Sequence, residues 1–188
     1  MARKHSDMAL TKAAIRNKIL LKLKTQKEGI RARKSGSICR KLFRTRAFKK
    51  ARIVMFYKAF SGEVDTERMI KAAQKLGKIV VVPVCGEHRA LIPCILKDGA
   101  RLLRGPYGIW EPAIKKSVPL RAIDLVVVPG VAFTKDGKRL GRGKGYYDRF
   151  LSRLSQHAAV IGLGFDFQVL ADLPTNAMDV NVQKVIAA

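Results

Sequence analysis

Apolar residues at helical spacing open the chain. From Ala9 to Lys27 they recur every three or four positions with lysines between them, which predicts a basic amphipathic helix. The same spacing predicts a second helix from about Ser37 to Ala47. Each helix therefore has one face to bury and one face for solvent.

Short, continuous apolar runs follow the helices, and such runs are typical of strands buried on both faces. Two of them, Arg52–Tyr57 and Lys78–Val84, flank a helical pattern that ends at Gly77 and has Asp65 or Thr66 as its N-cap. Strand, helix and strand in about thirty residues form a βαβ unit, so a parallel sheet is predicted. Further strands are expected at Ala90–Leu96, Leu125–Val128, Ala158–Phe165 and Val180–Ile186.

Two irregular stretches interrupt the series of helices and strands. Lys97–Leu120 contains Gly105-Pro-Tyr-Gly-Ile-Trp-Glu-Pro112, and we expect a loop there that acts as a lid or as a wall of a ligand site. Trp110 in this loop is either a packed anchor or a ligand contact. A second turn-rich connection is predicted at Gln168–Thr175.

The strand that ends at Val128 leads into a loop rich in glycine and basic residues. Its segment Gly141-Arg-Gly-Lys-Gly145 opens a helix, where free backbone N–H groups and the helix dipole favour an anion. A P-loop is excluded because Lys138 and Gly145 stand at its required Gly and Ser or Thr positions. A dinucleotide fingerprint is excluded because Tyr146 replaces its last glycine. The loop is an anion site of unassigned class or a flexible basic hairpin.

Composition limits the class of protein. A length of 188 residues and a hydrophobic content of 48% suit one globular domain, residues 1–188. No apolar run is long enough to cross a membrane, and no apolar stretch follows the charged N-terminus as in a signal peptide, so a soluble, cytoplasmic protein is expected. The widely spaced Cys39, Cys85 and Cys94 indicate neither a disulfide framework nor a structural zinc site.

The net charge of +24 is unusual, and residues 1–52 carry +16 of it. A field of that sign favours polyanionic partners such as nucleotides, polyglutamylated metabolites or RNA. The charge does not choose among these partners, and a solvated basic surface is an equally good explanation. Lys12 and Arg16 lie four residues apart, so they share a helix face that suits two phosphates or solvent.

Ligands of open α/β sheets bind beyond the carboxyl ends of the strands. This rule gathers the loops after Tyr57, Val128 and Phe165 into one crevice. The crevice is expected to bring together Glu63, Arg142, Lys144, Tyr146 and Asp148.

These motifs resemble those of the 5-formyltetrahydrofolate cyclo-ligases, also called methenyltetrahydrofolate synthetases. The resemblance covers nearly the whole chain and rests on Lys12-Ala-Ala-Ile-Arg16, Glu63-Val-Asp-Thr66, Gly108-Ile-Trp-Glu-Pro112, Pro129-Gly-Val-Ala-Phe133 and Arg139-Leu-Gly-Arg-Gly-Lys-Gly-Tyr-Tyr-Asp-Arg149. It implies a three-layer α/β/α sandwich with a mainly parallel, Rossmann-like open sheet and N-terminal helices. It also implies an ATP- and Mg²⁺-dependent closure of 5-formyltetrahydrofolate to 5,10-methenyltetrahydrofolate, in which the formyl oxygen is phosphorylated and ADP and phosphate are released.

The resemblance also implies roles for individual positions. The ATP-binding residues would be Lys12, Arg16, Arg139, Leu140, Gly141, Arg142, Gly143, Lys144, Gly145, Tyr146 and Tyr147. The folate-binding residues would be Lys58, Glu63, Trp110, Arg142, Gly143, Lys144, Gly145 and Tyr146. Catalysis would fall to Arg142, Lys144 and Tyr146, and Mg²⁺ to Asp148 and Asp179. The residues alone favour plainer interpretations, in which Asp148 is a first-turn helix charge, Glu63 a surface residue and Asp179 a turn former. A monomer that binds two small substrates is expected.

The chain departs from the family pattern in its C-terminal half. Thr134 stands where members usually have Asp, and Gln183 stands where they have a later Asp. The usual Pro-x-Glu-x-His-Asp reads Pro174-Thr-Asn-Ala-Met-Asp179, so Asn176 and Met178 are substitutions. Two alternatives stay open: a basic RNA-binding protein on this scaffold, and a nucleotide-binding protein that has lost ring closure. The sequence has no RNA-reading signature to favour the first.

Overall fold

The computed structural model describes residues 11–188, and no helix among them is both long and apolar enough to cross a membrane. Three helices open this part of the chain: α1 (Lys12–Thr25), α2 (Glu28–Arg44) and α3 (Arg46–Lys50). The first predicted helix is confirmed from Lys12 to Thr25 but ends two residues before the expected Lys27, and its predicted start at Ala9 lies outside the described residues.

The second predicted helix was wrong at both ends. Helix α2 begins at Glu28 rather than near Ser37. The prediction missed the first half of the helix because that half has few apolar residues and buries the polar Ser35. It ends at Arg44, where Thr45 adopts an extended conformation. The Thr45 side chain then accepts a hydrogen bond from the backbone N–H of Phe48 and caps the short helix α3.

A six-stranded sheet forms the centre of the fold, in the order β11-β9-β6-β1-β2-β3. Only β3 runs antiparallel to its neighbour, so the predicted open and mainly parallel sheet is confirmed. Helix α4 (Glu67–Lys75) connects β1 to β2 and completes the predicted βαβ unit. The strands are β1 (Ile53–Met55), β2 (Ile79–Cys85), β3 (Leu91–Ile95), β6 (Leu125–Pro129), β9 (Ala159–Gly164) and β11 (Lys184–Ala187).

The sequence predicted the C-terminal end of α4 correctly, but it left two candidates for the side chain that caps the N-terminal end. Gly77 follows the helix with φ +74, as expected of a glycine in that place. Asp65 accepts the N–H of Glu67, while the hydroxyl of Thr66 donates to the carbonyl of Tyr57 instead of capping the helix. Leu76 ends the helix as an exposed side chain.

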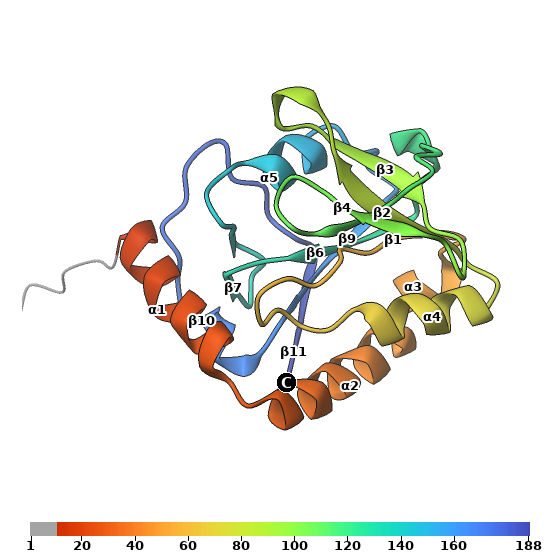
Figure 1. Cartoon of the computed structure of the whole chain (residues 1–188). Coiled ribbons are helices and arrows are strands. Elements are labelled where there is room, and N and C mark those ends of the chain that lie inside the picture. The colour runs from red at the N-terminus through yellow and green to blue at the C-terminus, as the bar shows by residue number, and fades with distance from the viewer. Residues whose placement is uncertain (1–10) are drawn as a thin grey trace, which may run out of the picture.

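Two hydrophobic clusters cover the two faces of the sheet and make the predicted three layers (Figure 1). Residues of α1, α2, α3 and α4 pack on one face with Val54, Val80 and Val127. Helix α5 (Tyr146–Leu151) packs on the other face with Val126 and Val160. Irregular segments of the chain also pack on this face. The third layer is therefore thin.

Both stretches predicted as irregular contain short strands. A hairpin of β4 (Leu102–Arg104) and β5 (Trp110–Pro112) occupies the first stretch. After β6, the strands β7 (Ala132–Thr134) and β8 (Arg139–Leu140) pair with each other, and β10 (Val169–Leu170) pairs with β7. Three single-turn 3₁₀ helices complete the described elements: η1 (Glu87–Arg89), η2 (Leu120–Ala122) and η3 (Asp166–Gln168).

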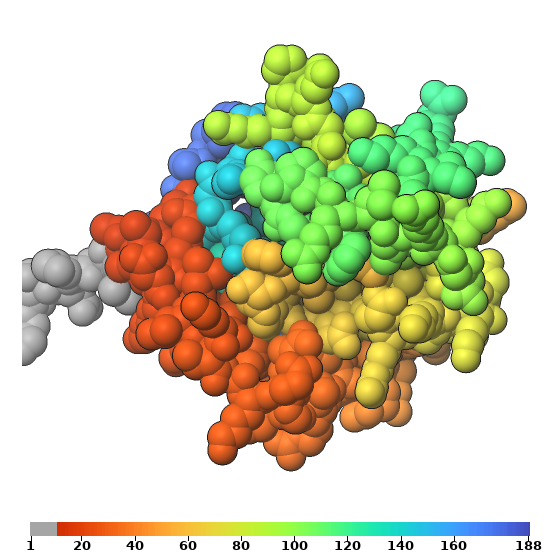
Figure 2. All heavy atoms as spheres, viewed as in Figure 1, coloured from red at the N-terminus to blue at the C-terminus, as the bar shows by residue number. Residues whose placement is uncertain are grey.

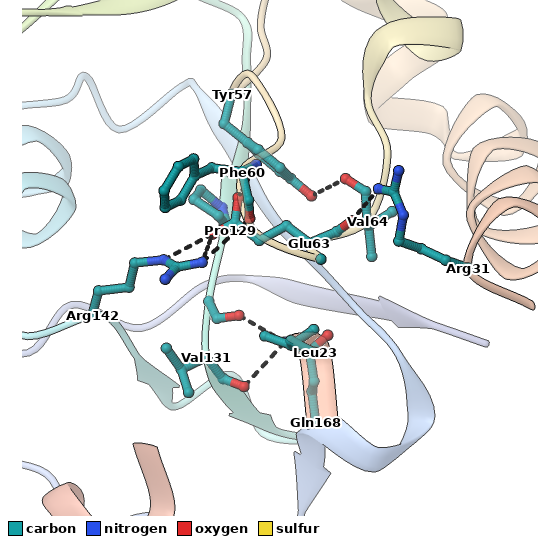
Figure 3. A network of polar contacts seen from close by, with 12 residues as sticks. Leu23, Arg31, Tyr57, Phe60, Glu63, Val64, Pro129, Val131, Arg142 and Gln168 are labelled. Atoms are coloured by element: carbon teal, nitrogen blue, oxygen red, sulfur yellow. Dashed lines mark hydrogen bonds and ion pairs between the residues drawn. The ribbon is translucent and has the colours of Figure 1, made fainter. Parts of the chain in front are cut away.

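The buried side chain of Gln168 fixes the turn after β6 (Figure 3). Its amide nitrogen donates to the carbonyls of Gly130 and Val131 at 2.8 and 3.0 Å, and its amide oxygen accepts the N–H of Phe165 at 2.8 Å. The ring of Phe133 fills the space beside Gly130 that a side chain would need. The chain that enters the glycine-rich loop is thus held in place.

Candidate active site

A cavity of about 350 Å³ lies at the carboxyl ends of β1, β2 and β6. Figure 2 shows the hollow between the cyan glycine-rich loop, the green β4–β5 hairpin and the orange loop after β1. The predicted crevice is confirmed for the loops after Tyr57 and Val128, but no described residue after Phe165 lines it. The predicted site residues in its wall are Lys58, Glu63, Arg139, Gly141, Arg142, Gly143, Lys144, Gly145, Tyr146, Tyr147 and Asp148.

The glycine-rich loop connects β8 to α5. Gly143 and Gly145 have φ of +95 and +69, conformations that only glycine adopts without strain, and Gly145 is the N-cap of α5. The loop begins at Leu140, whose carbonyl accepts the N–H of Val131 at 2.7 Å and so joins the loop to the end of β6. The loop is an ordered wall of the cavity rather than an independent hairpin.

Helix α1 lies against this loop from outside the cavity. The guanidinium of Arg16 donates to the carbonyl of Gly141 at 2.8 Å, and the ammonium of Lys12 pairs with Asp179. The shared face of Lys12 and Arg16 therefore points at the loop and at the segment that carries Asp179. Neither side chain lines the cavity, so their ATP-binding role stays a prediction.

The carboxylate of Glu63 and the guanidinium of Arg142 form an ion pair in the cavity wall (Figure 3). Oε1 of Glu63 accepts Nε and Nη2 of Arg142 at 3.1 and 3.0 Å, and Oε2 accepts the N–H of Phe60 at 3.0 Å. Burial raises the pKa of Glu63, and Arg142 opposes that effect. Glu63, which was expected to bind folate, thus holds Arg142, which was expected to contact both ATP and folate.

Arg139 crosses beneath the loop and is almost fully buried, with a side chain 2% exposed. Its Nη2 donates to Asp148 at 2.6 Å, whereas its Nε has no hydrogen-bond partner among the described residues. An unpartnered buried donor costs about 1–3 kcal/mol. Arg139 also lines the cavity, where its guanidinium places positive charge that suits an anionic ligand.

The two predicted metal ligands lie on neighbouring segments. Asp148 accepts the N–H of Val180 at 3.3 Å, which places it beside the residue that follows Asp179. Both carboxylates are balanced by basic groups, Asp148 by Arg139 and Asp179 by Lys12. No group of three or more potential ligands for a metal ion occurs in residues 11–188. The donors fit an ion held by one or two carboxylates and by phosphate, as Mg²⁺ commonly is.

The tip of the β4–β5 hairpin reaches the glycine-rich loop across the cavity. The hydroxyls of Tyr107 and Tyr146 lie 2.9 Å apart, and Nζ of Lys144 lies 4.2 Å from the centroid of the Tyr107 ring. This hydrogen bond raises the pKa of Tyr146 to about 12. Tyr146 therefore keeps its proton at neutral pH, which suits a hydrogen-bond donor and not a general base.

Trp110 lies outside the cavity wall. It is 45% exposed, and its ring packs against the guanidinium of Arg104, 5.3 Å away. Successive side chains of a strand point to opposite faces, so the neighbouring Glu111 faces inward and lines the cavity. The substrate-binding role of Trp110 stays a prediction that the lining of the cavity does not support.

Glu111 and Tyr107 are cavity residues that sequence reasoning did not single out. The buried carboxylate of Glu111 accepts the N–H of Cys85 at 3.0 Å, which ties the hairpin to the end of β2. Gly105 must be small, because a Cβ there would lie 2.6 Å from the carboxyl carbon of Glu111. Two glycines and a proline around Tyr107 were the available signal that this aromatic ring stands at a loop tip.

The four residues that depart from the family pattern do not line the cavity, and three of them have local structural roles. Thr134 accepts the N–H of Lys138 and closes the β7–β8 hairpin. Asn176 donates its N–H to Asp179 at 2.7 Å, and Gln183 accepts the N–H of Val160 at 3.0 Å. Met178 is exposed. None of the four lines the cavity.

Comparisons with known proteins agree over nearly the full length of the chain. The model of the 5-formyltetrahydrofolate cyclo-ligase family matches residues 9–188. A 5-formyltetrahydrofolate cyclo-ligase of Mus musculus is 28% identical over 187 residues, which cover 93% of this chain and 92% of the mouse protein. The enzyme of the same name from Haemophilus influenzae is 33% identical over 138 residues, or 70% of this chain and 73% of its own.

A solved structure extends the agreement to three dimensions. The structure of Aquifex aeolicus 5,10-methenyltetrahydrofolate synthetase matches with a TM-score of 0.84 and 34% sequence identity, covering 94% of this chain and 89% of that chain. The matching fold, the family model and the cavity formed by the family motifs lead to one conclusion. The chain belongs to the 5-formyltetrahydrofolate cyclo-ligase family.

Proposed function

We propose that the protein closes the ring of 5-formyltetrahydrofolate to give 5,10-methenyltetrahydrofolate, and that ATP drives the reaction. The observation that carries this proposal is the shared wall of one cavity, where Glu63, Arg142 and Lys144 meet. A buried carboxylate suits the N–H groups of a pterin, and basic side chains on a glycine-rich loop suit phosphates. Family membership adds the ligase reaction, in which bond formation is coupled to nucleotide cleavage.

The chemistry begins at the formyl oxygen. This oxygen attacks the γ-phosphorus of ATP, the bond to ADP breaks, and the amide-like oxygen becomes a phosphate ester that can leave. N10 then attacks the formyl carbon, the C–O bond breaks, phosphate departs with the electron pair, and N10 loses its proton. The protein contributes mainly position and charge to such a phosphoryl transfer.

Basic residues of the loop would carry the electrostatic part of the reaction. Arg142 and Lys144 would neutralise charge on the transferring phosphoryl group, and Arg139 in the cavity wall would add a further positive charge. Tyr146, protonated at neutral pH, would donate a hydrogen bond and offer a flat surface to the folate.

The ion pair between Glu63 and Arg142 makes the two substrates interdependent. A phosphate that takes Arg142 releases the carboxylate of Glu63, and a pterin that takes Glu63 releases the guanidinium. Once one substrate has broken the ion pair between Glu63 and Arg142, the other substrate no longer has to spend free energy on breaking it. By linkage, the two affinities rise by the same factor.

Asp148 and Asp179 would hold Mg²⁺, which neutralises phosphate charge when it is bound. In this proposal both carboxylates exchange a basic partner, Arg139 or Lys12, for the ion. The three free cysteines suit a reducing compartment, so we also propose a monomeric enzyme in the cytoplasm.

Activity can be tested with purified protein, 5-formyltetrahydrofolate and Mg-ATP. The conjugated methenyl product absorbs where the substrate does not, so absorbance should rise and the rise should require ATP. Absence of product across a pH and metal series would refute the proposed activity and leave the two alternatives, an RNA-binding protein and a nucleotide-binding protein that has lost ring closure.

Nucleotide binding by the loop can be tested with Lys144→Ala. Lys144 is exposed, so the variant should fold normally. Loss of a charge-assisted contact should weaken ATP binding at least about tenfold. Lys116→Ala removes an exposed lysine outside the cavity and serves as the matched control. Equal ATP affinity of the two variants would exclude Lys144 from the site.

A further inference from the structure

The basic residues of the N-terminal helices fall into two groups. Lys12 and Arg16 on α1 contact the glycine-rich loop or the segment beside it. The basic residues of α2 and α3 line no part of the cavity. Between Glu28 and Lys58 the sequence has ten Lys and Arg residues and no Asp or Glu. The proposed reaction gives this second group no function.

Seven of these basic side chains are exposed, and their charged groups have no hydrogen-bond or ion-pair partner within residues 11–188. By contrast, Arg31 and Lys34 each pair with an acidic side chain, and Lys41 donates to the carbonyl of Ala187. Clustered charges of one sign repel each other and oppose compaction. The seven residues, called the basic face below, are Arg33, Arg40, Arg44, Arg46, Lys49, Lys50 and Arg52.

The helix geometry aligns three of these arginines. Arg40 and Arg44 follow Arg33 by two and three helical turns, so all three project from one side of α2 over about 16 Å. Ile38 and Leu42 occupy the opposite, buried side of the helix. In Figure 1, α2 lies along the lower edge of the molecule, and in Figure 2 the hollow of the cavity opens nearer its centre.

We propose that the basic face binds the phosphate backbone of a nucleic-acid duplex. A strand of a duplex presents one phosphate per about 3.4 Å of axis, so the three arginines of α2 span several phosphates. Five of the seven residues are Arg, whose planar fork matches phosphate oxygens. The face would read charge and not bases, so binding would be independent of sequence.

The side chains around the basic face argue against three other kinds of partner: a membrane, single-stranded nucleic acid and most proteins. A helix that lies on a membrane needs several exposed apolar side chains beside its basic ones, but Ile30 is the one large exposed hydrophobic residue found in α2 and α3 as described. The face also has no exposed aromatic ring among the residues that the structure describes, and single-stranded nucleic acid and most protein partners would use such a ring. Duplex phosphates fit best.

Fluorescence anisotropy with a labelled 16-base-pair RNA duplex tests the proposal. At 50 mM salt we expect binding that weakens steeply as salt rises, with a slope of log K against log salt of about −4 to −6 for four to seven phosphate contacts. The triple variant Arg33→Gln, Arg40→Gln, Arg44→Gln should bind at least about tenfold more weakly and reduce the slope by about 3. A second duplex of different sequence should bind within about threefold of the first.

The matched control removes three exposed charges from the other side of the sheet: Lys116→Gln, Arg121→Gln, Arg153→Gln. It should retain duplex affinity within about threefold, because screened distant charges contribute little. Should the α2 variant fail to fold, Arg46→Gln, Lys49→Gln, Lys50→Gln tests the same face from α3. Both variants of the face should keep ring-closing activity, so a failure of this proposal is distinguishable from a failure of the proposed enzyme.

Three outcomes would overturn the proposal. The first is absence of duplex binding at 50 mM salt. The second is an equal loss of affinity in the control and in the α2 variant, which would indicate net charge alone. The third is binding to anionic phosphatidylserine vesicles or to poly-glutamate that exceeds binding to the duplex.

Discussion

Replacing Glu63 by Gln tests the proposed exchange of partners in the cavity. The substitution keeps the size of the side chain and its ability to accept the N–H of Phe60, but it removes the charge that holds Arg142. Arg142 should then be free to bind phosphate before any folate is present. We therefore expect Glu63→Gln to bind Mg-ATP more tightly than the wild type in the absence of folate, although its activity falls.

The size of the effect follows from the exposure of the two partners. Breaking a fully buried ion pair costs about 3–5 kcal/mol, whereas an exposed pair contributes at most about 1 kcal/mol. The side chain of Glu63 is 11% exposed, but that of Arg142 is 37% exposed and is largely screened by solvent. We take a value near 1 kcal/mol, which corresponds to about fivefold in affinity. Folate affinity should fall by about tenfold or more, because a charge-assisted hydrogen bond is lost.

Isothermal titration calorimetry with a nonhydrolysable ATP analogue and Mg²⁺ measures these effects. In the wild type, saturating folate should raise the affinity for the analogue about fivefold, and the analogue should raise folate affinity by the same factor. In Glu63→Gln the two affinities should be nearly independent. Asp172→Asn, which breaks the exposed pair with Lys138, is the matched control and should behave as the wild type. Unchanged or weaker binding of the analogue to Glu63→Gln would refute the exchange.

Three further predictions concern pH, backbone strain and the hairpin tip. Burial raises the pKa of Glu63 in the native state, so deprotonation of this carboxyl opposes folding. In denaturant titrations, the free energy of unfolding of the wild type relative to Glu63→Gln should therefore decrease as pH rises from the ordinary carboxyl pKa through the raised pKa. Gly62→Ala should lower Tm by at least about 5 °C, because its Cβ would lie 2.0 Å from the carbonyl oxygen of Leu23. Gly77→Ala is the control, because Gly77 has a similar φ but open space around it, and this variant should lower Tm less. Equal losses of Tm in the two variants would contradict the steric argument. Tyr107→Phe should return the pKa of Tyr146 from about 12 toward 10 in an ultraviolet titration, and an unchanged value would exclude the hydrogen bond as its cause.

The sheet could be predicted from sequence because its strands are short apolar runs buried on both faces. Strand β6 ends only one residue beyond the predicted run, at Pro129, and β2 is displaced from its predicted run by one residue, to Ile79–Cys85. The start of α2 was missed because Gly29 and Gly36 interrupt its apolar spacing and an arginine-rich surface hides its buried face. Burial of that half comes from tertiary contacts, which local spacing does not record.

Two of the three loops predicted for the cavity were correct, whereas its side-chain pairings were not predictable. Parallel strands bring their carboxyl ends to one edge, and this rule placed the loop after Tyr57 beside the loop after Val128. The ion pair of Glu63 with Arg142 joins residues 79 positions apart, and no local pattern specifies it. The choice between Trp110 and Glu111 needed the orientation of β5, because a shift of one residue exchanges the two faces of a strand.

The proposed phosphorylation of the formyl oxygen can be followed directly with an isotope. 5-Formyltetrahydrofolate labelled with ¹⁸O in the formyl group is converted with Mg-ATP, and the released phosphate is examined by mass spectrometry. The mechanism moves the formyl oxygen onto phosphorus, so each phosphate released per turnover should carry one ¹⁸O atom. Unlabelled phosphate at the same turnover would contradict the central claim, because ATP would then be cleaved by water and not by the substrate.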